Sequence, residues 1–141
     1  MDKQAKELEK IAETRRTDQG IITKLKSDIL FDSGKSDLKT SSDGQLSQMA
    51  AILKKYPENV LTIKGYTDST GSTTTNKSLS EKRAESVKAK LVNGGVPADT
   101  VSIVGMGPEN PVGDNKTPAG RSQNRRVEIE ITVDESKVPK S

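Results

Sequence analysis

A strict alternation of apolar and polar residues near the carboxyl end of the sequence constrains the fold more than any other feature. The apolar members of the segment 126–133 (RVEIEITV) are Val127, Ile129, Ile131 and Val133, and the residues between them are polar. Successive side chains of a strand point to opposite faces, so this pattern predicts a strand with one buried face and one wet face. The chain must therefore build a sheet that is covered on one side.

Two helical patterns supply the cover. The first has an apolar stripe at positions i, i+3, i+4 and i+7, formed by Leu46, Met49, Ala50 and Leu53. The second begins at Asn76, a favourable N-cap residue, and runs to about Val92, before the Gly94-Gly95 pair. The residues expected on its buried face are Leu79, Ala84, Val87 and Leu91.

Three further segments are rich in β-branched and apolar residues, which predicts strands: 20–31, which holds one strand or a pair, 59–66 and 100–106. The expected order is β-α-β-α-β-β. Strands joined through helices of this length imply right-handed crossovers and parallel neighbours, whereas the last strand follows a loop and could run antiparallel. We therefore expect an α/β two-layer sandwich, with a mixed, mainly parallel sheet and both main helices on one face.

The chain has 141 residues, the length of one domain with a short extension at each end. The charged segment 1–19 is expected to be an exposed, N-terminal helical linker remnant. The domain itself is expected at 20–133, and residues 134–141 are expected to form a flexible tail. No hydrophobic signal segment follows Met1 and no apolar run approaches the ~20 residues that span a bilayer, so membrane attachment would need a segment upstream of this sequence.

Histidine and cysteine are both absent from the sequence. Their absence excludes disulfides, thiol catalysis, serine–histidine triads and metal sites built on either residue. The loops also lack paired carboxylates for acid–base chemistry. We therefore expect no catalytic residue, metal or cofactor, and no enzyme activity. The 23 basic and 20 acidic residues are interspersed, which argues against a nucleic-acid partner.

One carboxylate and one guanidinium stand out around the second helix. Asp68 lies in a polar loop just past the strand 59–66, and Arg83 lies about two turns into the helix that follows. In α/β sheets, ligands bind at the carboxyl ends of strands. A carboxylate can take an ammonium group and a guanidinium can take a carboxylate, so the pair could hold a zwitterion. The alternative, favoured by spacing alone, is a turn-capping Asp68 and a surface salt bridge of Arg83.

Four blocks in order resemble the OmpA-like C-terminal domain, which is shared by outer-membrane anchors, peptidoglycan-associated lipoproteins and flagellar stator subunits. They are ILFDSGKSDL, GYTDSTGS, NKSLSEKRAESVKAKL and GRSQNRRVEIEI, with the Gly-rich turn VGMGPENPV before the last. The resemblance covers about residues 20–133. In the family, the Asp of the TD-x-x-G loop and the Arg of the LS-x-x-RA helix hold the diaminopimelate of the stem peptide, and these positions are Asp68 and Arg83 here.

The resemblance implies further ligand-site residues around this pair. Asn76, which opens the helix, would help to shape the site. The residues that would line the pocket or touch the peptide are Thr67, Thr70, Leu79, Asp32 and Ser33.

Other matched positions are expected to have different roles. Asn124 and Arg125 fit a family signature and are expected to be structural, tying the last strand to neighbouring loops. Arg126 is expected to face solvent. Tyr66 stands where the family often has His, and Thr75 stands where an aromatic residue is common, so both departures are expected to border the pocket.

The resemblance implies non-covalent binding of peptidoglycan, which would anchor a membrane protein or lipoprotein to the cell wall. Asp68 would pair with the diaminopimelate ammonium and Arg83 with a carboxylate of the same peptide. The implied location is the periplasm, with attachment to the outer membrane ahead of the inner one. Two alternatives remain open, a protein-interaction module and a stator-type module on the same fold, and so does the oligomeric state.

Overall fold

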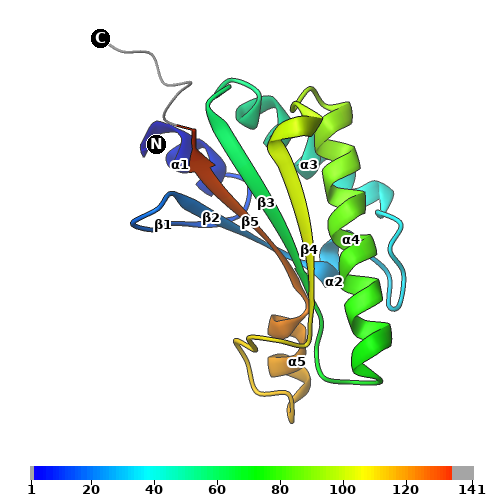
Figure 1. Ribbon diagram of the computed structural model, residues 1–141. Coiled ribbons are helices and arrows are strands. Elements are labelled where there is room, and N and C mark those ends of the chain that lie inside the picture. The colour runs from blue at the N-terminus through cyan, green and yellow to red at the C-terminus, as the bar shows by residue number, and fades with distance from the viewer. Residues whose placement is uncertain (1, 135–141) are drawn as a thin grey trace.

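A five-stranded mixed sheet carries its main helices on one face in the computed structural model, which describes residues 2–134 (Figure 1). The strands are β1 (Glu13–Arg16), β2 (Ile21–Lys26), β3 (Asn59–Tyr66), β4 (Val101–Gly107) and β5 (Arg126–Val133). The helices are α1 (Asp2–Glu9), α2 (Ser27–Leu30), α3 (Asp43–Leu53), α4 (Thr73–Asn93) and α5 (Pro118–Asn124). Two 3-10 turns, η1 (Thr40–Ser42) and η2 (Ala98–Thr100), precede α3 and β4.

The α/β sandwich is confirmed, but the expectation of a mainly parallel sheet is wrong. The strand order is β1-β2-β5-β3-β4, and of the pairs in this sheet only β3 and β4 are parallel. β2 and β3 run in the same direction, as the crossover between them requires, but β5 lies between them and is antiparallel to both. β5 follows the short helix α5 at the edge where β3 and β4 end, so it must enter the sheet in the opposite direction.

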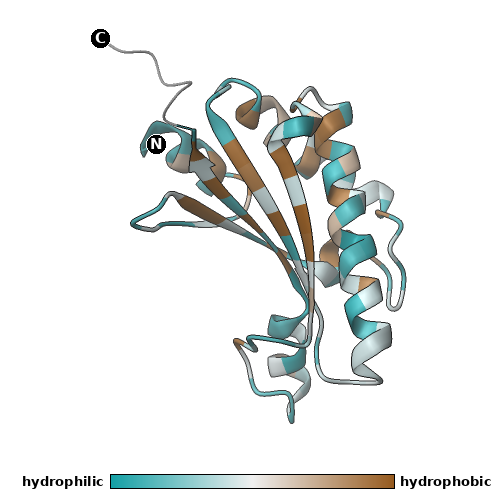
Figure 2. Cartoon of the chain, in the orientation of Figure 1, coloured by the Kyte–Doolittle hydropathy of each residue, from teal (hydrophilic) through white to brown (hydrophobic). Residues whose placement is uncertain are grey.

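The alternation in β5 has the expected consequence. Val127, Ile129 and Ile131 are buried and the residues between them are partly exposed, but Val133, expected on the buried face, is also partly exposed. Figure 2 shows apolar residues concentrated on the strands and at intervals along α4. The core therefore lies between the sheet and the layer of α1, α3 and α4.

Residues 2–16, expected to be exposed, are part of the folded unit. α1 buries Ala5 and Leu8 in the same core as α3 and α4, and β1 forms the edge of the sheet by pairing with β2. The side chains of Gln4 and Asn59 exchange amide hydrogen bonds of 3.1 and 2.6 Å.

The assignment of 20–133 as a peptidoglycan-binding domain stays a prediction, and residues 135–141 of the expected tail lie outside the described residues.

The segment 20–31 forms one strand, β2, followed by the single turn of helix α2. The Ser27 amide donates to the Arg125 carbonyl at 3.0 Å, and the Phe31 amide donates to the Ser27 carbonyl at 2.8 Å. The turn sends Phe31 into the core and leaves Asp28 at the surface. A strand that continued through these residues would not place Asp28 beside Arg125.

α4 begins earlier than expected, and its N-cap is Ser72 rather than Asn76. The Ser72 hydroxyl accepts a hydrogen bond from the Thr75 amide at 3.1 Å. Asn76 lies in the first helical turn, where its side chain donates to the Thr70 carbonyl at 2.7 Å. This contact fixes the β3–α4 loop, which carries Asp68.

Two glycines allow α4 to lie directly on β3 and β4. A Cβ on Gly65 would be 2.2 Å from the Ser80 carbonyl oxygen, and a Cβ on Gly105 would be 2.8 Å from the Lys77 carbonyl oxygen. The Ser80 hydroxyl also accepts a hydrogen bond from the Gly107 amide at 2.9 Å. The first turns of α4 are therefore held against the ends of these two strands.

The packing of α1 predicts that this helix unfolds together with the domain. Leu8→Ala should lower the free energy of unfolding by about 2–5 kcal/mol, because Leu8 is fully buried. Ile29→Ala removes a side chain of equal size that is half-exposed, so it should change the free energy by no more than about 0.5 kcal/mol. Urea unfolding measures both variants, and equal values for the two would contradict the inclusion of α1 in the core.

Candidate functional site

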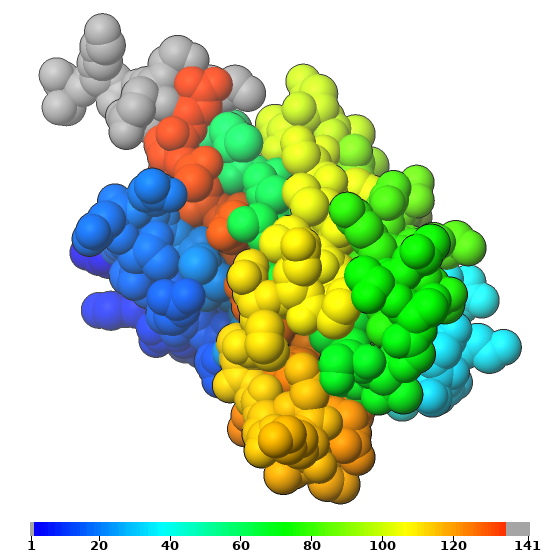
Figure 3. Space-filling model, turned by 60° about the horizontal axis from the view of Figure 1, so that its bottom comes forward, coloured from blue at the N-terminus to red at the C-terminus, as the bar shows by residue number. Residues whose placement is uncertain are grey.

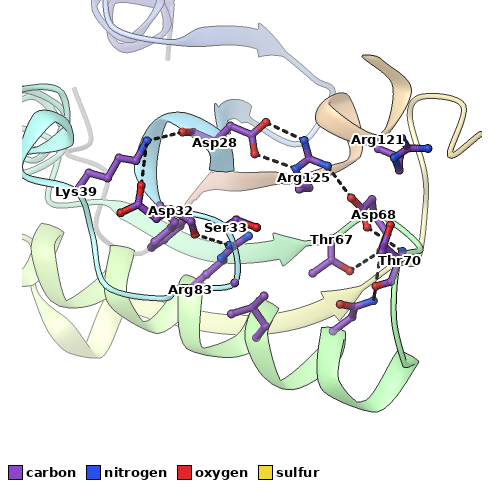
Figure 4. Close-up of a pocket in the computed structure, with 14 residues that line it drawn as sticks. Asp28, Asp32, Ser33, Lys39, Thr67, Asp68, Thr70, Arg83, Arg121 and Arg125 are labelled. Carbon is purple, nitrogen blue, oxygen red and sulfur yellow. Dashed lines mark hydrogen bonds and ion pairs between the residues drawn. The ribbon is translucent and has the colours of Figure 1, made fainter. Parts of the chain in front are cut away.

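A polar pocket of about 600 Å³ lies at the carboxyl end of β3, bordered by α2, α4 and α5 (Figure 4). The residues expected at the ligand site all line it: Asp32, Ser33, Thr67, Asp68, Thr70, Asn76, Leu79 and Arg83. Six residues outside that set line it as well: Asp28, Phe31, Gly34, Lys39, Arg121 and Arg125. Figure 3 shows the loop 108–117, in yellow, lying beside the β3–α4 loop, in green, at this end of the molecule.

Asp68 is held in one orientation by two donors. Its Oδ1 accepts the Thr70 amide at 2.8 Å, and its Oδ2 accepts Nη1 of Arg125 at 2.6 Å. The side chain is 12% exposed, and the carboxylate lies at the pocket wall. Each carboxylate oxygen can accept more than one hydrogen bond, so both remain able to receive a further donor.

The surroundings of Asp68 favour its charged form. Partial burial alone would raise its pKa, but the hydrogen bonds from the Thr70 amide and from Arg125 outweigh burial, so the pKa lies below its ordinary value. The carboxylate is therefore ionised at neutral pH and available to a cationic group.

Arg83 is buried, which overturns the alternative of a surface salt bridge. The residue is 4% exposed, and its guanidinium lies 4.9 Å from the centroid of the Phe31 ring. Nε donates to the Lys35 carbonyl at 2.8 Å and Nη2 donates to the Asp32 carbonyl at 3.3 Å. Burial lowers the pKa of Arg83.

Within residues 2–134, no carboxylate forms an ion pair with Arg83, and its Nη1 makes no hydrogen bond. A buried charge is costly unless it is paired. Since this guanidinium borders the pocket, an anionic group in the pocket could supply the missing partner. The pocket thus offers a fixed carboxylate and a guanidinium that lacks a counter-ion.

Arg125 was expected to be structural, and it lines the pocket as well. Nε and Nη2 donate to the two oxygens of Asp28 at 2.8 and 3.0 Å, while Nη1 reaches Asp68 (Figure 4). The hydrogen bonds that Arg125 donates to Asp28 and Asp68 raise the pKa of Arg125 above its ordinary value, and those that Asp28 accepts from Arg125 lower the pKa of Asp28. Sequence reasoning missed Asp28, although it directly precedes the first family-like block.

Asn124 connects the loop before α5 to the start of β5. Its Oδ1 accepts the amides of Val112 and Gly113, each at 2.7 Å. Its Nδ2 donates to the Gly113 carbonyl at 3.0 Å and to Oδ1 of Asn115 at 2.7 Å. These contacts are those that a structural role requires.

Arg126 does not face solvent, contrary to expectation. The residue is 2% exposed, and its guanidinium lies 3.7 Å from the centroid of the Tyr66 ring, across the β3–β5 pair. Nε donates to Glu128 at 2.6 Å and Nη2 donates to the Asn110 carbonyl at 3.0 Å. The loop that contains Asn110 therefore covers Arg126 at one end of the sheet face that the alternation pattern leaves wet, while Glu128, Glu130 and Thr132 on the same face stay partly exposed.

The two departures from the family pattern, Tyr66 and Thr75, make their contacts outside the pocket. Tyr66 is covered by Arg126, and Thr75 shares a hydrogen bond of 2.8 Å between its hydroxyl and that of Ser72. Neither residue lines the pocket. The expectation that both border it is therefore wrong.

Residues 2–134 contain no group of three or more acidic, His or Cys side chains arranged to hold a metal ion. Over the same residues, no helix has the length and apolar character needed to cross a membrane.

The chain is similar to several known proteins. The OmpA family pattern matches residues 30–125. The probable lipoprotein YiaD of Escherichia coli (strain K12) is 40% identical over 117 residues, which are 83% of this chain and 53% of that protein. The peptidoglycan-binding protein ArfA of Mycobacterium tuberculosis is 48% identical over 86 residues, 61% of this chain and 26% of that protein.

Among solved structures, the periplasmic domain of Helicobacter pylori MotB superimposes with a TM-score of 0.78 at 30% identity, covering 88% of this chain and 80% of that one. The chain spans about half the length of YiaD and about a quarter of ArfA.

The contacts of Asp68 predict its titration. Its carboxyl should titrate below the ordinary value of 3.8, and Arg125→Gln should raise this pKa, as measured by carbon-13 NMR. Because the folded-state pKa is lowered, the stability that ionised Asp68 provides is present above the unfolded-state pKa and is lost as pH falls through the folded-state value.

The difference in the free energy of unfolding between wild type and Arg125→Gln should therefore be largest near neutral pH and should become smaller below pH 3.8. Arg15→Gln, at an exposed arginine of β1, is the control and should leave the Asp68 titration unchanged. An Asp68 titration that is the same in wild type and Arg125→Gln would contradict the assigned contact.

Proposed function

The chain belongs to the OmpA family, and on that premise we propose that it binds peptidoglycan non-covalently and anchors a membrane protein or lipoprotein to the cell wall. The observation that carries this proposal is the buried Arg83 guanidinium, which lacks a carboxylate partner among the described residues and borders the same pocket as the ordered Asp68. The names of the relatives support it, since ArfA is described as peptidoglycan-binding and YiaD as a probable lipoprotein.

The ligand that fits this pair is an amino-acid head group with both charges, and we propose the diaminopimelate of the stem peptide. Its ammonium group would pair with Asp68, and its carboxylate would accept hydrogen bonds from Arg83. The small polar or apolar side chains of Thr67, Thr70 and Leu79 would line the remaining wall. A volume of about 600 Å³ is within the range of small-molecule pockets.

Binding by these residues consumes no group and needs no chemical step. Each charge-assisted hydrogen bond is worth about 1.5–3 kcal/mol, so one pocket should hold one stem peptide weakly. The cell wall is a repeating polymer, and a membrane-tethered protein can exchange one site for its neighbour at high effective concentration. Weak, reversible contacts thereby add up to firm attachment.

We place the protein in the periplasm, with attachment to the outer membrane preferred over the inner one. The similarity to a lipoprotein of Escherichia coli supports this placement. The similarity to the periplasmic domain of MotB keeps a stator-type module as the second candidate. Both candidates use the same pocket for the wall, and they differ in the rest of the protein.

Co-sedimentation with purified sacculi tests the proposal. Asp68→Asn and Arg83→Lys should each weaken binding to diaminopimelate-type sacculi by about tenfold or more, because each variant loses a charge-assisted hydrogen bond. Lysine-type sacculi should bind the wild type less well, since lysine lacks the terminal carboxylate that Arg83 would hold.

Asp18→Asn, in the exposed turn between β1 and β2, removes the same charge far from the pocket and should bind like the wild type. Circular dichroism confirms that each variant is folded. If binding survives both pocket substitutions, the pocket is not the wall site, and a protein-interaction module becomes the better explanation.

A further inference from the structure

Asp28 lines the pocket in contact with Arg125, and we propose that it is a positioning residue for ligand capture. By binding two of the three donor nitrogens of Arg125, it prevents this guanidinium from closing over the carboxylate of Asp68. The proposal rests on the proposed function, because it assumes that Asp68 receives the ligand's ammonium group. It goes further in assigning a role to a residue that need not touch the ligand.

Arg125 donates hydrogen bonds to two carboxylates, those of Asp28 and Asp68. Nε and Nη2 form parallel hydrogen bonds with Oδ1 and Oδ2 of Asp28, the two-pronged arrangement that guanidinium and carboxylate groups favour. Only Nη1 reaches Asp68, and it meets a single oxygen, Oδ2 (Figure 4). The other oxygen of Asp68 receives only the Thr70 amide.

Asp28 is itself held in place, so it can hold Arg125 in turn. Its Oδ2 also accepts the hydroxyl of Ser122 at 3.0 Å, and its backbone lies in the single turn of α2. The backbone of the same turn is tied to Arg125, because the Ser27 amide donates to the Arg125 carbonyl. Asp28 and Arg125 are therefore joined through both side chain and backbone.

Without Asp28, Arg125 would have Asp68 as its one carboxylate partner among these contacts. A two-pronged bond to Asp68 would then place a donor nitrogen of Arg125 on each of its oxygens and neutralise its charge, which would weaken the attraction for an incoming ammonium group. With Asp28 present, two carboxylates share one guanidinium, and one negative charge remains for the ligand. Other charged groups that line the pocket are Asp32, Lys39, Arg83 and Arg121.

The expected effect is moderate, because the Asp28–Arg125 pair is partly solvated. The Asp28 side chain is about half-exposed and that of Arg125 is nearly one-third exposed. Water screens charge interactions at such positions, so the contribution to binding should correspond to about a two- to fivefold change in affinity.

A double-mutant cycle tests the proposal, with affinity for a soluble stem peptide that contains diaminopimelate measured by calorimetry. Asp28→Asn should weaken binding about two- to fivefold, whereas in an Arg125→Gln background the same substitution should have no further effect. Asp99→Asn, an exposed carboxylate in η2, is the charge-matched control and should bind like the wild type. Equal losses in both backgrounds would mean that Asp28 acts without Arg125 and would overturn the proposal, as would no loss in either.

The Asp68 titration separates this proposal from the proposed function, since it needs no ligand. In Asp28→Asn, Arg125 should turn fully to Asp68, so the pKa of Asp68 should fall below its wild-type value. An unchanged or higher pKa would overturn the positioning role even if the wild type binds the peptide. If the wild type fails to bind, the proposed function falls, while a lowered pKa in Asp28→Asn would still show that Asp28 restrains Arg125.

Discussion

The close packing of α4 on β3 and β4 is the constraint on which the site depends. Helix and strands can approach this closely because Gly65 and Gly105 carry no side chain where α4 backbone atoms lie. The contact sets the start of α4 beside the loop that leaves β3, so that Asn76 can hold this loop and Arg83 can reach the same pocket as Asp68.

Two of the arginines that line the pocket, Arg83 and Arg125, have opposite kinds of partner. Arg125 has two carboxylates, Asp28 and Asp68, whereas Arg83 has backbone carbonyls and the face of Phe31. A guanidinium saturated by carboxylates orders its neighbours and attracts anions weakly, while one that has only neutral acceptors remains a strong anion site. This asymmetry would allow one pocket to receive both a cationic and an anionic group without the protein's own charges cancelling one another.

The sequence predicted correctly those features of the fold and of the site that depend on a short stretch of the chain. The alternation over 126–133 gave the correct faces of β5, and the resemblance of the loop and helix motifs to the OmpA-like domain, rather than spacing alone, predicted that Asp68 and Arg83 share one pocket. The position of β5 between β2 and β3 depends on pairing between distant segments, which a single sequence does not encode in any short window. The burial of Arg126 likewise depends on a long loop that folds over its side chain. Asp28 was not predicted as a site residue because its segment was expected to be a strand, whereas the structure has a turn of helix there.

The direction of β5 has a mechanical consequence for an anchor. This strand begins at Arg126, next to the pocket, and ends at Val133, near the opposite end of the molecule where α1 also lies (Figure 1). Tension between a ligand held in the pocket and the end of the molecule where α1 lies would act along the length of the strands, perpendicular to the hydrogen bonds that join β5 to β2 and β3. The bonds on both sides would then share the load in shear instead of opening one after another, a geometry suited to a domain that holds its position under pulling force.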